Sequence, residues 1–281
     1  MADETEKTLK NILEKSSLLF SDLISEIDKK LRNLRCYGGH RRFLIARLGS
    51  TGSTWLAKLL NSHPEVYCEH EGVLQKVYPK INYGSDDIIQ FIQTIAYDTH
   101  HNAYRATGDV GSIWLTHVNI LPKDLFATGL LIRHPARYLC TKIYIAKKET
   151  TVFKFTEIES KYNELLKEIW GIDLSLLDDI DRLFVRNSFL WVAQLALNSK
   201  SNVLIKIEQM RDTNYAKEIL YSLTGVEYDD YLIENMTTKK ENVRSNQPSS
   251  LKSLMEKFTP KQREWYNIIV SDVAEYIGYT V

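Results

Sequence analysis

The sequence predicts an α/β protein in which a central parallel sheet is flanked by helices, with an amphipathic helix ahead of it. Short apolar segments such as Phe43-Leu44-Ile45-Ala46 and Val203-Leu204-Ile205-Lys206-Ile207 alternate with longer segments of helical periodicity. That alternation indicates parallel strands joined by right-handed helical crossovers. The chain has 281 residues, of which 44% are hydrophobic, so it is long enough to bury a continuous core.

The segment 1–36 is predicted to form the amphipathic helix. Apolar residues recur at three- and four-residue steps from Leu9 to Leu34, with Glu, Lys and Asp between them. This pattern extends over roughly eight helical turns. Two roles fit it: the apolar stripe packs on the body of the protein, or it joins two copies as a homodimer or binds another partner. Gly38 and Gly39 then end the helix, and we expect a single domain over residues 40–281.

Further elements follow in order along the rest of the chain. Strands are predicted at residues 43–46, 66–68, 125–132 and 203–207, and helices at 55–61, 88–96, 138–147, 155–170, 174–197, 215–223 and 260–277. His63-Pro64 ends the first of these helices, because a residue before proline avoids the α conformation, and Thr259-Pro260 opens the last. The carboxyl ends of parallel strands meet at one edge of a sheet, where ligands bind. Gly49 and Arg133 both follow such strand ends.

Composition excludes several classes of function. Lys+Arg and Asp+Glu balance at 36 each, so no overall field favours a nucleic acid or an anionic membrane. The three cysteines are few and far apart, which argues against a disulfide framework and indicates a reducing compartment. The first residues are acidic where a signal peptide is basic, and no apolar run approaches the roughly 20 residues that span a bilayer. We therefore expect a soluble cytoplasmic protein without a membrane partner.

A phosphate-binding loop is predicted where the first strand leads into a helix. It reads Gly49-Ser50-Thr51-Gly52-Ser53-Thr54. Two glycines permit a tight turn, hydroxyls add donors, and the helix start directs unpaired amides and a positive dipole end at an anion. Nucleoside triphosphatases need a lysine here to reach the outer phosphates, but Ser53 occupies that position. The loop therefore favours a nucleotide with one phosphate at its 5′ end and no bound metal.

A second anion site is predicted at Arg133, directly after the strand at 125–132. Thr141 follows eight residues later. If a helix begins near Pro135, Thr141 lies two turns along it, and its hydroxyl can face one phosphate together with the guanidinium of Arg133.

The loop and this pair together resemble the cofactor site of sulfotransferases. These enzymes use 3′-phosphoadenosine 5′-phosphosulfate (PAPS) and release 3′-phosphoadenosine 5′-phosphate (PAP). In the family the loop holds the 5′-phosphosulfate, and an arginine-to-serine pair at the same spacing holds the 3′-phosphate. The stretch from Thr51 to Cys68 is also similar to the loop, helix and His-Pro-x-Val strand of protein-tyrosine and carbohydrate sulfotransferases. The resemblance covers residues 43–145 and implies a P-loop-like sulfotransferase fold.

The resemblance also implies two candidates for the catalytic base. Glu71 matches the catalytic glutamate of the protein-tyrosine enzymes. Thr116-His117, followed by Leu121-Pro122, resembles the segment whose histidine is the base in the cytosolic small-molecule enzymes, so His117 is the second candidate. Both remain open.

For the cofactor, the resemblance implies that the amides of Gly52, Ser53 and Thr54 hold the 5′-phosphate. Thr51 belongs to the same loop, and Trp55 would offer an aromatic face to the adenine. No metal is expected to take part.

The chain departs from the family where positive charge is needed. Ser50 occupies the position of a lysine or arginine that neutralises the bridging oxygen as sulfate leaves, and Val110 replaces a second lysine. Arg47, at the end of the first strand, is a candidate for the missing cation, although a surface arginine is an equal alternative. The C-terminal Arg-Lys-Gly clamp of the family is absent, and Lys239, Lys240 and Arg244 are candidates to replace it.

These observations predict a PAPS-dependent sulfotransferase that acts on a hydroxyl or amine of a small-molecule acceptor. Two alternatives remain. A relative without catalytic activity could bind the nucleotide or a partner, which the missing lysines favour. A small-molecule kinase would need a loop lysine and a magnesium carboxylate, and neither is evident in the sequence.

Overall fold

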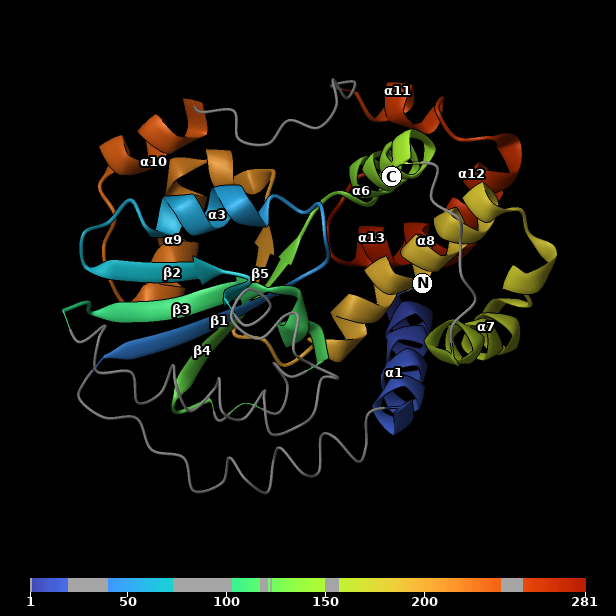
Figure 1. The fold of residues 1–281 in the computed structure, drawn as a ribbon, viewed down its shortest axis with the longest axis horizontal. Coiled ribbons are helices and arrows are strands. Elements are labelled where there is room, and N and C mark those ends of the chain that lie inside the picture. Colours follow the sequence, from blue (N-terminus) through green and yellow to red (C-terminus); the bar gives the residue numbers. More distant parts are fainter. Residues whose placement is uncertain are drawn as a thin grey trace. The chain divides into compact units, whose positions relative to one another are not determined.

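The structure is a computed structural model, and it describes residues 2–19, 40–72, 103–116, 121, 123–149, 157–238 and 250–281. The chain divides into two compact units. The first unit comprises Met1–Leu18, Arg133–Ala196 and Val243–Val281, and the second comprises Leu19–Ile132 and Leu197–Asn242. The first unit is helical and the second contains the sheet (Figure 1). The predicted boundary at residue 40 stays a prediction.

The second unit is built on a five-stranded sheet. Its strands are β1 Arg41–Arg47, β2 Val66–His70, β3 Ala106–Gly111, β4 Phe126–Ile132 and β5 Val203–Lys206. They lie in the order β2-β3-β1-β4-β5, and every neighbouring pair is parallel. The predicted central parallel sheet flanked by helices is therefore confirmed.

Helices of the second unit cover one face of this sheet. They are α3 Ser53–Leu60, α9 Thr213–Thr224 and α10 Asp230–Thr238, and the short 3₁₀ turns are η2 Ser112–Thr116 and η5 Gln209–Arg211. α3 and α9 contact the strands, and α10 packs against both helices (Figure 1). The strand β1 lies in the middle of the sheet, and its residues from Phe43 to Ala46 are fully buried. This explains its uninterrupted apolar run, because a central strand of a parallel sheet has no solvent face.

Strand β3 was not among the predicted strands. Its sequence, Ala-Thr-Gly-Asp-Val-Gly, contains glycine and aspartate, which are depleted in strands. It lies between β2 and β1, and all six of its residues are buried. A Cβ at Gly108 would lie 2.1 Å from the Phe43 carbonyl oxygen and 2.4 Å from the Phe43 ring, so only glycine fits there.

The first unit consists of helices. They are α1 Ala2–Leu19, α6 Pro135–Glu149, α7 Glu157–Trp170, η4 Leu174–Leu176, α8 Asp179–Leu197, α11 Leu251–Met255, α12 Pro260–Tyr266, η6 Asn267–Ser271 and α13 Asp272–Tyr276. The apolar middle of α8 is buried, with Phe184, Phe189 and Trp191 at most 1% exposed. Thr259 caps α12 in a capping box with Gln262, as the Thr-Pro signal predicts.

Differences from the predicted elements are local. The predicted helix over 174–197 is a 3₁₀ turn followed by α8 from Asp179, and α10 and α11 were not predicted. The N-terminal helix is described as far as Leu19, and the predicted helix over 88–96 lies outside the described residues. Among the described helices, none has the length and apolar character that crossing a membrane requires.

Candidate functional site

The predicted phosphate loop connects β1 to α3. Gly52 is the N-cap of α3, with φ 93° and ψ 17°, and no side chain caps the helix. A Cβ at Gly52 would also lie 2.9 Å from Cγ1 of Ile207, so both the backbone conformation and the available space require glycine. A helix start whose N-cap supplies no acceptor leaves its first amides available to an anion.

The hydroxyl residues of the loop have different environments. Ser50 adopts a positive φ of 72°, which is rare outside glycine. Thr51 is fully buried, and its Oγ1 donates to the carbonyl of Leu48 at 2.8 Å. The hydroxyl of Thr51 therefore holds the loop together, while Thr54 lies half-buried on the first turn of α3.

Ser53, the first residue of α3, contacts the end of β2. Its Oγ lies 2.9 Å from Nε2 of His70, and Ser53 is 6% exposed. Burial, followed by the nearby positive charge of Arg47, lowers the pKa of His70, while Glu71 raises it. His70 was not predicted as a site residue, because no motif in the sequence contains it.

Trp55 anchors α3 to α10. Its Nε1 donates to the carbonyl of Met236 at 3.0 Å, and the half-buried indole packs against the apolar core under α3. Contact with adenine stays a prediction for this residue.

Glu71 follows β2 and pairs with Arg47, the last residue of β1. Nη2 of Arg47 and Oε1 of Glu71 form the ion pair, and each side chain is 11% exposed. Glu71 also accepts from the amide of Ser112 at Oε1 (3.1 Å) and from the Ser112 hydroxyl at Oε2 (3.3 Å). Burial lowers the pKa of Arg47, and the carboxylates of Glu71 and Asp109 oppose that shift. The two predicted site residues Arg47 and Glu71 are thus brought together.

Asp109 lies beside this pair, in β3, and is fully buried. Its Oδ1 accepts from the amide of Gly72 at 2.9 Å and its Oδ2 from Nε1 of Trp114 at 2.7 Å. Burial raises the pKa of Asp109 to about 7, although both hydrogen bonds oppose the shift. The bond to Gly72 also fixes the turn at Glu71, whose φ is 56°. A charged residue inside a glycine-rich segment was the available signal for Asp109.

The predicted second anion pair lies in the first unit. Helix α6 begins at Pro135 as expected, and Nη1 of Arg133 donates to Oγ1 of Thr141 at 3.4 Å. Thr141 is buried and donates to the carbonyl of Arg137 at 2.9 Å, while Nε1 of Trp191 donates to the carbonyl of Arg133 at 2.9 Å. The guanidinium and the hydroxyl therefore lie next to each other, and their role in phosphate binding stays a prediction.

Other candidates fall outside the described residues. These are His117, Lys239, Lys240 and Arg244. The question of the catalytic base therefore remains open between Glu71 and His117.

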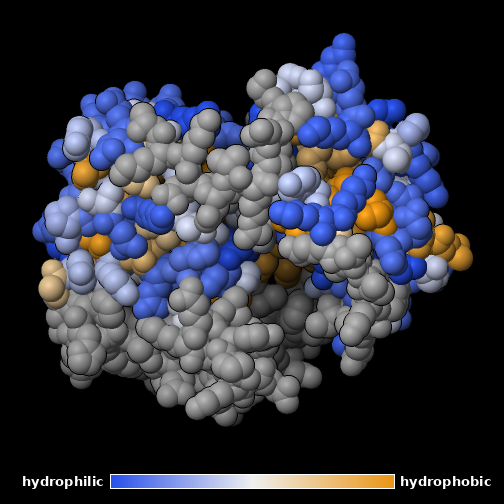
Figure 2. Space-filling model, turned by 45° about the horizontal axis from the view of Figure 1, so that its top comes forward, coloured by the Kyte–Doolittle hydropathy of each residue, from blue (hydrophilic) through white to orange (hydrophobic). Residues whose placement is uncertain are grey.

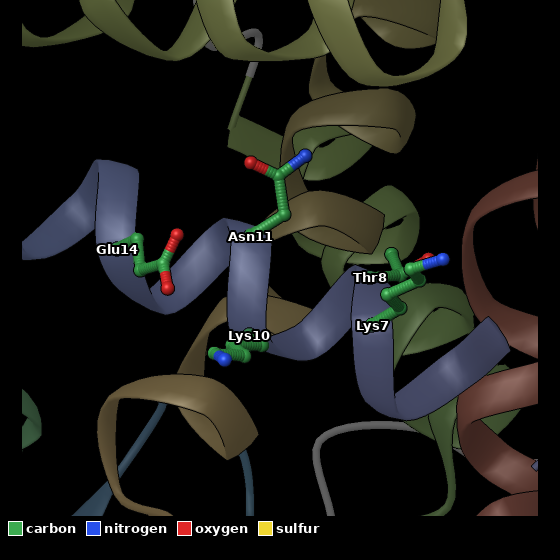
Figure 3. Close-up of a pocket in the computed structure, with 5 residues that line it drawn as sticks. All are labelled: Lys7, Thr8, Lys10, Asn11 and Glu14. Atoms are coloured by element: carbon green, nitrogen blue, oxygen red, sulfur yellow. The ribbon is translucent and has the colours of Figure 1, made fainter. Parts of the chain in front are cut away.

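The surface offers weaker features. A shallow hollow on α1 is lined by Lys7, Thr8, Lys10, Asn11 and Glu14, which point in different directions along the helix rather than toward one place (Figure 3). Hydrophilic side chains cover most of the described surface in Figure 2, with separate small apolar patches. Leu176, at 82% exposed, is the most exposed of the large apolar side chains among the described residues.

Comparisons with known proteins give a loose likeness in fold. No protein-family model and no curated protein matches the sequence. Among solved structures, mouse sulfotransferase SULT7A1 complexed with PAP matches with 14% identity and a TM-score of 0.48, over 92% of this chain and 89% of that one. A sulfotransferase from Alicyclobacillus acidocaldarius matches with 14% identity and a TM-score of 0.41, over 87% of this chain and 98% of that one. Both of those proteins are sulfotransferases, and the likeness concerns the course of the backbone alone.

Proposed function

We propose that this protein transfers a sulfuryl group from PAPS to a hydroxyl or amine of a small-molecule acceptor. The observation that carries the proposal is the start of α3, where Gly52 in a left-handed conformation presents uncapped amides at the end of a buried parallel strand. This arrangement suits a phosphate, and the absence of a loop lysine argues against a triphosphate.

The cofactor would be held by two kinds of group. The amides of Gly52, Ser53 and Thr54 suit the 5′-phosphate, because N–H groups at a helix start donate to an anion and the positive end of the helix dipole favours negative charge. Arg133 and Thr141 suit the 3′-phosphate, since a guanidinium donates strong, directed hydrogen bonds to phosphate oxygens. No residue of this scheme requires a metal.

In the reaction, an acceptor oxygen or nitrogen attacks the sulfur, and the bond between sulfur and the bridging oxygen of PAPS breaks. PAP leaves with the electron pair of that bond, and a base takes the acceptor's proton. Glu71 and His117 are the candidates for this base. Positioning in line and stabilisation of the developing charge contribute most of the rate in such transfers.

The ion pair between Arg47 and Glu71 suggests how Arg47 could take part in the reaction. If Glu71 takes the acceptor's proton, its carboxylate becomes neutral and no longer pairs fully with Arg47. The positive charge of Arg47 then stabilises the departing phosphate, and this would compensate for serine at position 50. If His117 is the base instead, Glu71 keeps its charge and holds Arg47 throughout.

Calorimetry with PAP and with adenosine 5′-monophosphate, which lacks the 3′-phosphate, tests the proposal. Arg133→Ala should weaken PAP binding by about 1.5–3 kcal/mol, the range for a hydrogen bond to a charged group, with little effect on the monophosphate. Arg211→Ala, which removes an exposed arginine in η5, is the control and should leave both affinities unchanged. Equal losses for the two nucleotides would contradict the role of Arg133.

A transfer assay then separates the proposal from its alternatives. Sulfate transfer from PAPS to a panel of alcohols, amines and phenols, detected by mass, would establish the enzyme. Tight PAP binding without transfer to any acceptor would favour a non-catalytic nucleotide-binding protein. Phosphate transfer from a nucleoside triphosphate would favour the kinase.

A further inference from the structure

We propose that His70 is a positioning residue for the phosphate loop. In the proposed arrangement, Nε2–H of His70 donates to Oγ of Ser53, which lies 2.9 Å away, and this leaves the hydroxyl hydrogen of Ser53 available to an oxygen of the 5′-phosphate. The inference rests on the proposed function, because it assigns the phosphate to the start of α3.

The hydrogen-bonding capacity of Ser53 limits what it can offer to a phosphate. A hydroxyl has one hydrogen to donate and two lone pairs that accept. A bound phosphate offers only acceptors, so Ser53 helps it only by donating. If Nε2 of His70 accepted the hydroxyl hydrogen, Ser53 would present lone pairs to the phosphate. The 2.9 Å contact therefore supports phosphate binding in one tautomer of His70 and opposes it in the other.

The surroundings of His70 favour a neutral imidazole, and the tautomer of a neutral imidazole determines whether Nε2 donates or accepts. Burial and the positive charge of Arg47 both lower the pKa of His70, and the carboxylate of Glu71 opposes them. The lowered pKa keeps the imidazole neutral at pH 7, with a single N–H hydrogen. The position of that hydrogen then decides what Ser53 offers.

The position of Ser53 supports the same conclusion. It is the first residue of α3, next to the glycine cap, and only 6% of its surface is exposed. Because the side chain of Ser53 is nearly buried at the start of the helix, few orientations of its hydroxyl are open. One hydrogen bond to Oγ is then enough to fix the orientation of the hydroxyl. His70 is the last residue of β2, so the sheet rather than the loop fixes the position of its imidazole ring.

The opposite tautomer has a different meaning. A serine that donates to a neutral imidazole is the arrangement of a nucleophile and its base. The proposal therefore competes with a specific alternative, in which the hydroxyl of Ser53 is activated rather than directed at a phosphate.

Nitrogen-15 NMR of the histidine side chains in the wild-type protein tests the tautomer without any mutation. We expect a protonated, pyrrole-type signal for Nε2 of His70 and an unprotonated, pyridine-type signal for Nδ1 at pH 7. His70→Gln, which removes the signals of this ring alone, assigns them. A pyridine-type Nε2 would overturn the proposal.

PAP affinity tests the consequence. His70→Ala and Ser53→Ala should each weaken PAP about fivefold to tenfold, as expected for one lost hydrogen bond, and the double variant should bind no more weakly than either single one. His70→Gln should restore most of the affinity, because its amide can donate to Ser53. The matched control is His63→Ala, which removes a half-buried histidine whose Nδ1 accepts from the amide of Glu65 at 3.1 Å, and it should leave PAP affinity unchanged.

Each outcome separates the two proposals. Additive losses in the double variant, or no loss in His70→Ala, would overturn the role of His70 while leaving the nucleotide site intact. A wild-type protein that binds no PAP would overturn the proposed function, and the NMR measurement would still decide the tautomer.

Discussion

Glu71, directly after β2, and Asp109, in the neighbouring strand β3, are two buried carboxylates whose surroundings differ. Glu71, 8% exposed, pairs with the cation of Arg47 and accepts two hydrogen bonds from Ser112. Asp109, 0% exposed, accepts from the neutral N–H groups of Gly72 and Trp114, and no cation pairs with it among the described residues. Hydrogen bonds alone therefore do not keep this fully buried carboxylate in its usual pKa range, since burial outweighs them.

The difference also assigns the two residues different tasks. Glu71 directly follows strand β2, and the cation of Arg47 balances its charge. Asp109 lies inside the sheet, where its oxygens fix the backbone of Gly72 and the indole of Trp114. Asp109 therefore positions the turn that carries Glu71 rather than reacting itself.

The largest expected effect comes from separating the ion pair. Arg47→Met should destabilise the protein by about 3–5 kcal/mol, because it leaves the charge of Glu71 buried without a cation. Chemical denaturation measures this loss. The matched control is Arg105→Met, which breaks the exposed pair with Glu65 and should cost less than about 1 kcal/mol. Similar losses in the two variants would show that the Arg47 pair is as weak as a surface pair.

The next effect is a dependence of stability on pH that Asp109 produces. The unfolded carboxyl loses its proton near pH 3.8 and the folded one near pH 7, so between these values the folded state holds more protons. The contribution of Asp109 to the free energy of unfolding should therefore fall by about 4 kcal/mol as the pH rises from 4 to 8, and level off above about pH 8, once the folded carboxyl has lost its proton.

The difference between wild-type and Asp109→Asn unfolding curves, recorded from pH 4 to pH 8, isolates this contribution. Titrating groups that do not interact with Asp109 are common to both proteins and cancel. A difference that does not change with pH would mean that Asp109 keeps an ordinary pKa in the folded protein.

Smaller effects are expected when one hydrogen-bond donor is removed from Asp109 or from Glu71. Trp114→Phe removes the side-chain donor that Asp109 has within the described part of the chain, and it should cost about 1.5–3 kcal/mol for the hydrogen bond at pH 8, in addition to lost packing. Ser112→Ala should cost about 0.5–1.5 kcal/mol, because Glu71 keeps Arg47 and the Ser112 amide.

The pH dependence of the free energy of unfolding separates the hydrogen bond from packing in these two variants, because lost packing does not change with pH. The bond from Trp114 lowers the pKa of Asp109, so Trp114→Phe should move the end of the falling region of stability to higher pH. Ser112→Ala should leave that region in place. Equal curves for the two variants would remove the distinction between the two carboxylates.

Much of the fold could be predicted because its signals are local. The buried run from Phe43 to Ala46, the glycine at position 52 and the helix start at Pro135 all depend on nearby residues. The spacing of Arg133 and Thr141 on α6 follows from helix geometry, and the structure has the two groups in contact. Strand β3 could not be predicted, since Gly108 and Asp109 have low strand propensity and neighbouring strands on both sides hold them in place.

Local patterns in the sequence are enough to predict the alternation of strands and helices, the glycine that begins α3 and the arginine that follows β4. These features depend on periodicity and on backbone conformations that few residue types can adopt. Which side chains meet depends on the three-dimensional packing. Arg47 and Glu71, 24 residues apart, and Glu71 and Ser112, 41 apart, are joined because parallel strands end at the same edge of the sheet. Such pairings depend on strand order and register, which no local pattern encodes.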